Sequence, residues 1–300
     1  MIISITITYQ PDLATLRKQL ESLRSQVASM WVIDNGSSEA KLESLQRLCK
    51  EFNVALQTLG YNSGIAHAQN VGIAAARAEG ATHILLMDQD SEASPSMVAT
   101  LAETLEAVPH AAAAGPSTYD MRTGRSTFFP IDFVKGYWPK HWRPINGVFP
   151  QSVEVAALIS SGSLIRISAL PEEKPMLEDW FIDHVDTEWC FRIRAKGWVL
   201  LGVPKTQLKH QLGDKISQVW FFGWKPVAHH SPLRDYYMFR NSVLLVKKDY
   251  VPWRWKIYLV ARLFLFWTFF IIYTPQRLNR MKMTAMGIFD GIRGHVGQWK

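Results

Sequence analysis

Residues Thr82–Asp90 read THILLMDQD, an apolar run that is followed at once by two aspartates. The run Thr82–Met87 has the length and apolar composition of a strand buried on both faces, which is typical of a parallel sheet covered by helices. Asp88 and Asp90 come directly after this strand and point in the same direction. They therefore lie at the edge where open α/β sheets bind ligands.

The rest of the first half alternates between strand and helix patterns. Residues 1–9 and Met30–Asp34 are short apolar runs, and leucines recur at helical spacing between them. A further helix is predicted over Ile65–Glu79 and ends at Gly80. Other elements are predicted at residues 41–51 (helix), 53–59 (strand), 153–167 (two strands around Ser160–Ser163), 181–197 (helix) and 198–203 (strand). The pattern predicts an α/β fold with a mostly parallel sheet.

Two other motifs fall at the same predicted edge. Asp34-Asn35-Gly36-Ser37 follows the second strand, and Asn62-Ser63-Gly64 precedes the helix that begins at Ile65. Small residues in and after Asn62–Gly64 allow the backbone to approach a ligand or a strand closely, and the helix start offers N–H groups to an anion. Asn62 is also suited to be a simple helix cap. The Asp88/Asp90 pair could hold a hard divalent cation, although the same spacing occurs in ordinary turns.

Taken in order, these motifs resemble the opening of the family 2 glycosyltransferases, which have the GT-A fold. The resemblance covers about the first 215 residues. It rests on Thr8–Pro11, VIDNGS, NSGIAHAQNVG, LLMDQDS, Ser160–Ser163 and FIDHVDTEWCFR. The later segments LKHQLGD and HHSPLRDYYMFRN are most similar to bacterial L-rhamnosyltransferases. The resemblance implies an inverting enzyme that transfers L-rhamnose from dTDP-L-rhamnose to a hydroxyl of a cell-surface glycan or glycolipid, such as lipopolysaccharide core or O-antigen.

The resemblance also implies roles for single residues. Asp34 would contact the pyrimidine base, and Asn62 and Gly64 would lie near the nucleotide. Asp88 would lie by the ribose and the metal, and Asp90 would bind the Mg²⁺ or Mn²⁺ that bridges the diphosphate. Further residues expected in the nucleotide-sugar site are Thr8, Tyr9 and Gln89. His210 is expected either to bind the metal or a phosphate, or to be structural.

A general base must lie on the opposite face of the sugar from the leaving diphosphate. Alignment of TEWCFR with the family's usual ending puts the base at Asp186, and Asp183 is the second choice. The aromatic residues around Asp186 predict partial burial and a raised carboxyl pKa. Glu188 is better explained as part of a solvated helix start.

Arg234 and Arg240 have two interpretations that the sequence leaves open. Their guanidinium groups could clamp the diphosphate or an anionic acceptor. They could equally form a cationic face against lipid headgroups.

The charge is unevenly distributed along the chain. Residues 1–150 carry 12 Lys and Arg against 14 Asp and Glu, whereas residues 191–300 carry 19 against 4 together with seven tryptophans. Residues 257–274 are apolar except for Arg262 and have basic residues on both sides. This composition favours a helix lying in a membrane surface over a spanning helix, and a membrane surface over nucleic acid. We therefore predict a GT-A domain at 1–235, a helical membrane-associating region at 236–300, and a location at the cytoplasmic face of the bacterial inner membrane.

Several alternatives are weighed against this hypothesis. A UDP-sugar could replace the dTDP-sugar as the donor, and an inert GT-A module could tether partners to the membrane. The aspartate set argues against inertness. No G-x-G-x-x-G follows the first strand, which disfavours a dinucleotide oxidoreductase. The two cysteines and the absence of a secretory signal at the start indicate a reducing compartment.

Overall fold

The computed structural model describes residues 1–121, 124–127, 129–132, 139–144, 147–210, 215–220 and 224–299. The helices are α1 (Leu13–Leu23), α2 (Glu39–Phe52), α3 (Ile65–Ala78), α4 (Met97–Ala107), η1 (Ile167–Ala169), η2 (Glu178–Trp180), α5 (Val185–Arg194), α6 (Pro232–Val246), α7 (Trp253–Tyr273) and α8 (Arg277–Arg293). The strands are β1 (Ile2–Thr8), β2 (Ser29–Asp34), β3 (Ala55–Thr58), β4 (His83–Asp88), β5 (Glu92–Ala93), β6 (Ala111–Asp120), β7 (Arg125–Thr127), β8 (Pro130–Ile131), β9 (Lys140–His141), β10 (Val153–Glu154), β11 (Leu164–Arg166), β12 (Val199–Lys209), β13 (Lys215–Trp220) and β14 (Trp224–His229).

The main sheet is mixed, with strand order β10-β12-β6-β11-β4-β1-β2-β3. Strands β4, β1, β2 and β3 run parallel, and β11 is inserted antiparallel between β4 and β6. In this register Thr8 of β1 is opposite Asp34 of β2, and Ile7 is opposite Asp88 of β4. The polar ends of three strands therefore meet at one edge, as the sequence predicts.

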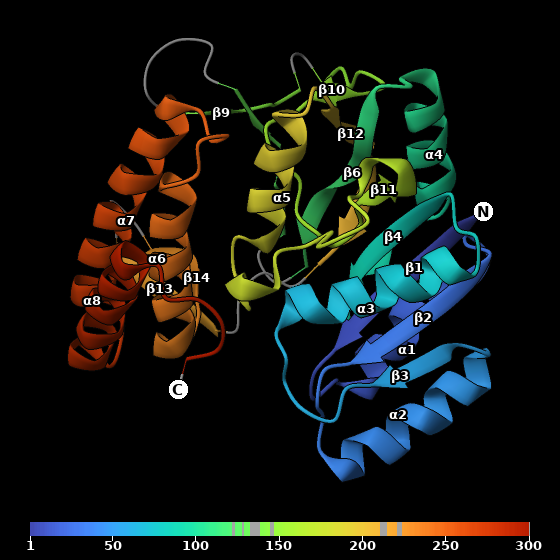
Figure 1. The fold of residues 1–300 in the computed structure, drawn as a ribbon, viewed down its shortest axis with the longest axis horizontal. Coiled ribbons are helices and arrows are strands. Elements are labelled where there is room, and N and C mark those ends of the chain that lie inside the picture. Colours follow the sequence, from blue (N-terminus) through green and yellow to red (C-terminus); the bar gives the residue numbers. More distant parts are fainter. Residues whose placement is uncertain are drawn as a thin grey trace.

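Helices cover both faces of this sheet (Figure 1). On one face, β1 and β4 alternate their apolar side chains into a core shared with α3 and α5; on the other, they pack with α1, α2 and α4. Gly72 of α3 permits close packing on β1, because a Cβ at this position would come within 2.3 Å of Ile5 Cγ2. The packing function that the sequence suggests for the small residues of α3 therefore holds at Gly72.

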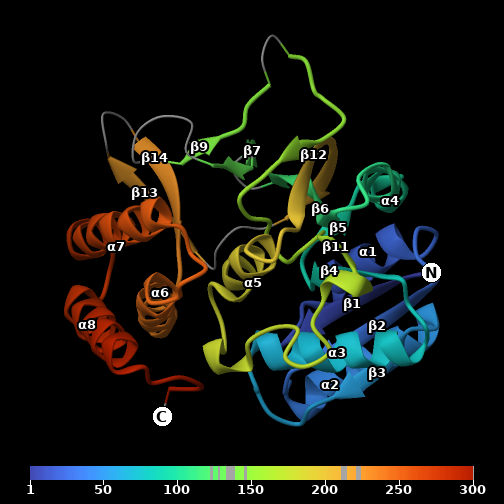
Figure 2. The same cartoon turned by 45° about the horizontal axis from the view of Figure 1, so that its top comes forward.

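Helices α6, α7 and α8 form a layer of their own, separated from the main sheet by α5 (Figures 1 and 2). Gly287 and Gly291 allow α8 to lie directly on α6, since a Cβ at either position would overlap α6 atoms within 3 Å. Residue 235, predicted as the last of the GT-A domain, lies inside α6. A division at 235/236 would therefore fall within this continuous helix.

The apolar segment predicted at 257–274 lies in α7 up to Tyr273, and Thr274 is the C-cap of this helix. In the described part of the chain, this helix is the one long and apolar enough to cross a membrane, judged by length and composition alone. Core helices of soluble proteins pass the same test, but they are mostly buried, whereas only 17% of the apolar window of α7 is buried. Cys49 and Cys190 are both buried and free.

Candidate active site

A cleft of about 560 Å³ opens at the carboxyl edge of β1, β2 and β4. It is closed by the start of α3, the Ser160–Ser161 turn and the segment before α5. The predicted site residues that line it are Thr8, Tyr9, Asn62, Gly64, Asp88, Gln89, Asp90, Asp183, Asp186, His210 and Arg234. Residues separated by more than 200 positions in the sequence thus meet in one cleft.

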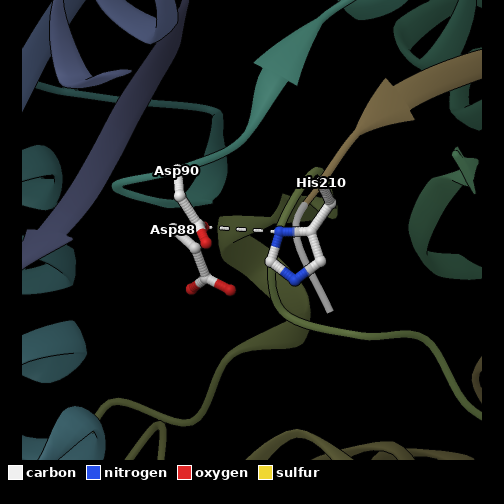
Figure 3. A group of neighbouring side chains, drawn as sticks. All are labelled: Asp88, Asp90 and His210. Carbon is white, nitrogen blue, oxygen red and sulfur yellow. Dashed lines mark ion pairs between the residues drawn. The ribbon is translucent and has the colours of Figure 1, made fainter. Parts of the chain in front are cut away.

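Asp88, Asp90 and His210 bring one ligand atom each to within 4.8 Å of one another (Figure 3). His210 Nδ1 lies 3.4 Å from Asp90 Oδ1. Burial raises the pKa of Asp88 to about 6, and the neighbouring charge of Asp90 adds to the rise, whereas His210 opposes it. Burial lowers the pKa of His210, but its hydrogen bond to Asp90 and the charges of both aspartates outweigh this and raise it overall. The raised pKa values of Asp88 and His210 show that this group of side chains favours added positive charge. Its carboxylate oxygens and imidazole nitrogen are suitable ligand atoms for a divalent cation.

Two serines that the sequence reasoning did not assign hold this group in place. Ser91 Oγ lies 2.8 Å from His210 Nδ1, and Ser161 Oγ donates to Ser91 Oγ at 2.8 Å. The backbone N–H of Asp88 donates to Ser161 Oγ at 3.0 Å. Ser161 belongs to the Ser160–Ser163 motif, and Ser91 directly follows Asp90. The sequence therefore marks both serines as motif residues but does not indicate which side chains they bond.

The side of the cleft formed by the ends of β1 and β4 and the start of α3 is built from short polar contacts. Tyr9 and Gln89 bond to each other twice, through Tyr9 N–H to Gln89 Oε1 at 2.8 Å and Gln89 Nε2 to the Tyr9 carbonyl at 3.3 Å. Asn62 Oδ1 accepts from the N–H of Gly64 and from Asn35 Nδ2. Gly64 is the N-cap of α3, so Asn62 orders the turn before the helix and does not cap it. Asn35 also lines the cleft, although its sequence pattern indicates only a turn residue.

The start of α3 is engaged by the segment before α5. Gly64 has φ +89°, and a Cβ here would lie 2.7 Å from the Phe181 carbonyl oxygen. The Ile65 N–H donates to that oxygen at 2.7 Å. One of the helix-start N–H groups expected to attract an anion is therefore already used within the protein.

Three predictions need correction. Asp34 is buried behind the cleft, where its carboxylate accepts from Thr8 Oγ1 and from the N–H groups of Gly36 and Ser37, so it does not line the cleft. Arg240 is buried as well and donates to backbone carbonyls, away from any diphosphate in the cleft and from lipid headgroups. Glu188 is fully buried rather than solvated; it pairs with Arg192 and accepts from the Tyr250 hydroxyl at 2.6 Å.

The two candidate bases differ in their surroundings. Asp186, in the first turn of α5, accepts from the N–H of Thr187 at 2.6 Å. Burial raises its pKa against the opposing hydrogen bonds, and the charge of Asp183 raises it further. The carboxylate of Asp183 lies 3.3 Å from Nε of Arg234. Asp183 therefore has a cation partner in the cleft wall, whereas Asp186 has a raised pKa and faces the cavity.

This arrangement defines a class of protein: an α/β fold of the GT-A type, with acidic and imidazole ligands for a cation at the carboxyl edge of its sheet. Residues 4–172 match the family model described as glycosyl transferase family 2. The chain is also 32% identical, over 99% of its length and 97% of the other's, to the dTDP-rhamnosyl transferase RfbF of Shigella flexneri. The chain belongs to glycosyl transferase family 2 and is a glycosyltransferase.

Solved structures agree with this fold. GalNAc-T7 with UDP, GalNAc and Mn²⁺ superposes with a TM-score of 0.61 at 14% identity; 98% of this chain is covered, and the chain spans 56% of that protein. The mannosyltransferase PcManGT of Pyrobaculum calidifontis with GDP-Man and Mn²⁺ gives 0.56 at 13% identity, covering 97% of this chain and 75% of that one. TarS 1-349 of S. aureus with UDP gives 0.57 at 13% identity, covering 98% and 92%. These likenesses confirm the predicted GT-A fold.

Proposed function

We propose that the protein is an inverting rhamnosyltransferase that moves L-rhamnose from dTDP-L-rhamnose to a hydroxyl of a cell-surface glycan or glycolipid. The observation that carries the proposal is that a candidate cation site and a partly buried candidate base, Asp186, lie in one cleft. The nearly full-length relationship to a dTDP-rhamnosyl transferase supports the donor.

Asp88, Asp90 and His210 would hold Mg²⁺ or Mn²⁺, and their crowded negative charge fits such an ion. A bound divalent cation would neutralise the charge that develops on the departing nucleoside diphosphate. Ser91 and Ser161 keep the imidazole turned toward the aspartates. Arg234 adds a positive charge in the same cleft, beside Asp183.

Asp186 is the proposed base and would accept the proton of the acceptor hydroxyl. Burial favours its neutral form, so its pKa is raised toward the working pH and its carboxylate is a stronger base than an exposed aspartate. Asp183 is the weaker candidate because its carboxylate is already paired with Arg234. This pairing gives Asp183 an orienting role beside the donor.

The acceptor would approach through a second cavity of about 200 Å³. Asp186 lines both cavities, and Ile159 and Ser161 form part of the wall between them. An in-line displacement requires the acceptor to arrive on the side of the sugar away from the diphosphate, and the second cavity would supply that approach because it shares Asp186 with the first. Phe129 and Leu158 supply apolar surface for a sugar ring, and Thr127 and His141 supply polar groups.

A lipid-linked acceptor, such as lipopolysaccharide core or an O-antigen precursor, would bring the enzyme to the cytoplasmic face of the inner membrane. Helix α7 exposes Val260, Phe264 and Leu265, with more than half of each side chain accessible. Cationic side chains lie beside aromatic rings on the same helix: Arg254 is 5.5 Å from the Trp253 ring and Arg262 is 4.8 Å from the Phe266 ring. This combination favours a helix that lies in an anionic membrane surface.

A UDP-sugar donor is the second candidate, favoured by the UDP-bound structures of similar fold. A hydrolysis screen of the purified protein against dTDP- and UDP-sugars, with Mg²⁺ or Mn²⁺, separates the two. Release of dTDP from dTDP-L-rhamnose at a rate well above that of the UDP-sugars supports our proposal. A preference for a UDP-sugar would overturn the donor assignment, and no hydrolysis or transfer with either would overturn the proposed activity.

A further inference from the structure

The segment from the last residue of η2 to the start of α5, residues 180–184, has an unusual backbone. Phe181, Asp183 and His184 all have φ near +60°, a region that residues other than glycine rarely adopt. Such a conformation persists only where its surroundings determine it. Because Asp186 is the second residue of α5, two positions after this segment, the shape of the segment sets where the base points.

One side chain of α6 contacts most of this segment. Asn241 is fully buried, and its Nδ2 donates to the carbonyl oxygens of Trp180 at 2.8 Å, Ile182 at 2.7 Å and Asp183 at 2.9 Å. Its Oδ1 accepts from Arg240 Nε at 2.9 Å, which fixes the orientation of the amide. Three carbonyls of a strained turn therefore converge on a single amide group.

Neighbouring residues of α6 extend this contact. Arg240 Nη2 donates to the Trp180 carbonyl at 3.2 Å, and its Nη1 donates to the Gly297 carbonyl at 2.6 Å. Ser242 Oγ lies 2.9 Å from His184 Nε2. Arg240 therefore does not act in the cleft. It holds the backbone carbonyls of Trp180 and Gly297 behind the cleft.

We propose that Asn241 is a positioning residue, which holds residues 180–184 so that Asp186 faces the acceptor and Asp183 faces Arg234. Asn241 does not line the cleft, so it acts through these residues and not on the substrate. The inference rests on the proposed function only for the identity of the base. The proposal predicts that kcat depends on the N–H donors of residue 241 and not on the size of its side chain.

Asn241→Asp tests this directly, because the shape is kept while both N–H donors are lost. With dTDP-L-rhamnose as the substrate, kcat should fall about 100-fold, the scale of loss expected for a misplaced reacting group, whereas KM should change less than about twofold. The affinity for dTDP with Mn²⁺ should stay at the wild-type value, because the nucleotide side of the cleft is untouched. Asn241→Ser keeps one donor, so its kcat should lie between those of the wild type and Asn241→Asp. If the aspartate variant does not fold, Asn241→Ser serves as the test in its place.

Hydrogen exchange supplies a readout that is independent of the reaction. The N–H of Ile182 donates to the Trp180 carbonyl within the segment, and the N–H of Phe181 donates to the carbonyl of Glu178 just before it. The exchange of both N–H groups should accelerate in Asn241→Asp. Leu245→Ala is the matched control: Leu245 is a buried residue of the same helix that packs in the main core. It should lower Tm without changing exchange at 181–182 or kcat.

Equal effects of Asn241→Asp and Leu245→Ala on kcat and exchange would overturn the proposal. An Asn241→Asp variant that loses dTDP affinity but keeps the wild-type kcat would overturn it as well. If the wild-type protein does not turn over dTDP-L-rhamnose, the proposed function fails while the exchange comparison still decides the role of Asn241.

Discussion

Asp235, near the start of α6, forms an ion pair with Arg280 of α8, and both side chains are almost fully buried. Burial raises the pKa of Asp235 to about 6, while the positive charge and hydrogen bond of Arg280 oppose that rise. Arg280 also donates to the carbonyl of His230, a residue that lines the cleft. The last helix is therefore joined to the helix that carries Arg234 and Asn241.

We therefore expect Arg280→Met to destabilise the whole protein. An unpaired buried carboxylate costs about 3–5 kcal/mol of unfolding free energy, which urea denaturation would measure. Arg277→Met, on an exposed residue of the same helix, is the control and should change stability by less than about 0.5 kcal/mol. A small effect of Arg280→Met would show that residues 236–300 form a separable region after all.

Asp90→Ala should abolish transfer while leaving the fold intact. It removes a ligand from a group with few oxygen donors, so the charge stabilisation of the diphosphate is lost, and we expect a fall of about 100-fold or more in kcat/KM. Calorimetric titration with Mn²⁺ should show weakened binding. Glu92→Gln is the control: Glu92 pairs with Lys209 outside the cleft and should leave both measurements unchanged. Full activity of Asp90→Ala in metal-depleted buffer would exclude the metal role.

The strand ends were predictable from the sequence because parallel strands bring their carboxyl ends to one edge. The apolar runs before Asp34 and Asp88 therefore located the cleft from local pattern alone. The sequence could not indicate that the carboxylate of Asp34 turns back to its own loop, leaving the next residue, Asn35, to line the cleft. That outcome depends on the three-dimensional geometry of a single turn.

The errors in the second half have a common physical cause. Arg240 and Glu188 are charged, and a sequence pattern indicates only that an isolated charged residue lies at the surface or contacts a ligand. Each is instead buried and has a partner that is distant in sequence: Arg240 has the carbonyl of Gly297, and Glu188 has the hydroxyl of Tyr250 in addition to Arg192, four residues further on. No local spacing reveals such pairs. Residues 211–214, part of the LKHQLGD segment, lie outside the described residues.

Asp186→Asn should lose transfer yet still bind dTDP, because the amide keeps the shape and cannot accept a proton. Asp183→Asn should retain more transfer activity than Asp186→Asn. Isothermal titration with dTDP and a transfer assay would compare the two variants. A dead Asp183→Asn together with an active Asp186→Asn would reverse the assignment of the base.

The pH dependence gives a second test of this base. Transfer requires the carboxylate form of Asp186, so kcat/KM should fall as the pH falls through its raised pKa. The charge of Asp183 contributes to that rise, so Asp183→Asn should move the acid limb to lower pH. A limb at the same pH in Asp183→Asn and the wild type would argue against Asp186 as the titrating group.

The exposed face of α7 should bind anionic vesicles in a salt-dependent way. Flotation of the full chain with phosphatidylglycerol vesicles should weaken at high salt, because screening removes the attraction of the cationic residues and leaves apolar insertion. Arg254 and Lys256 lie near the start of α7, and each surface cation contributes about 1 kcal/mol, so replacing both with Gln should weaken binding about 30-fold. Arg47→Gln is the control: Arg47 is an exposed residue of α2, which lies at the opposite end of the molecule from α7 (Figure 1), and the variant should bind as the wild type does. Retention that salt does not affect and only detergent reverses would instead show that α7 spans the bilayer, and no flotation at all would exclude a membrane surface as its partner.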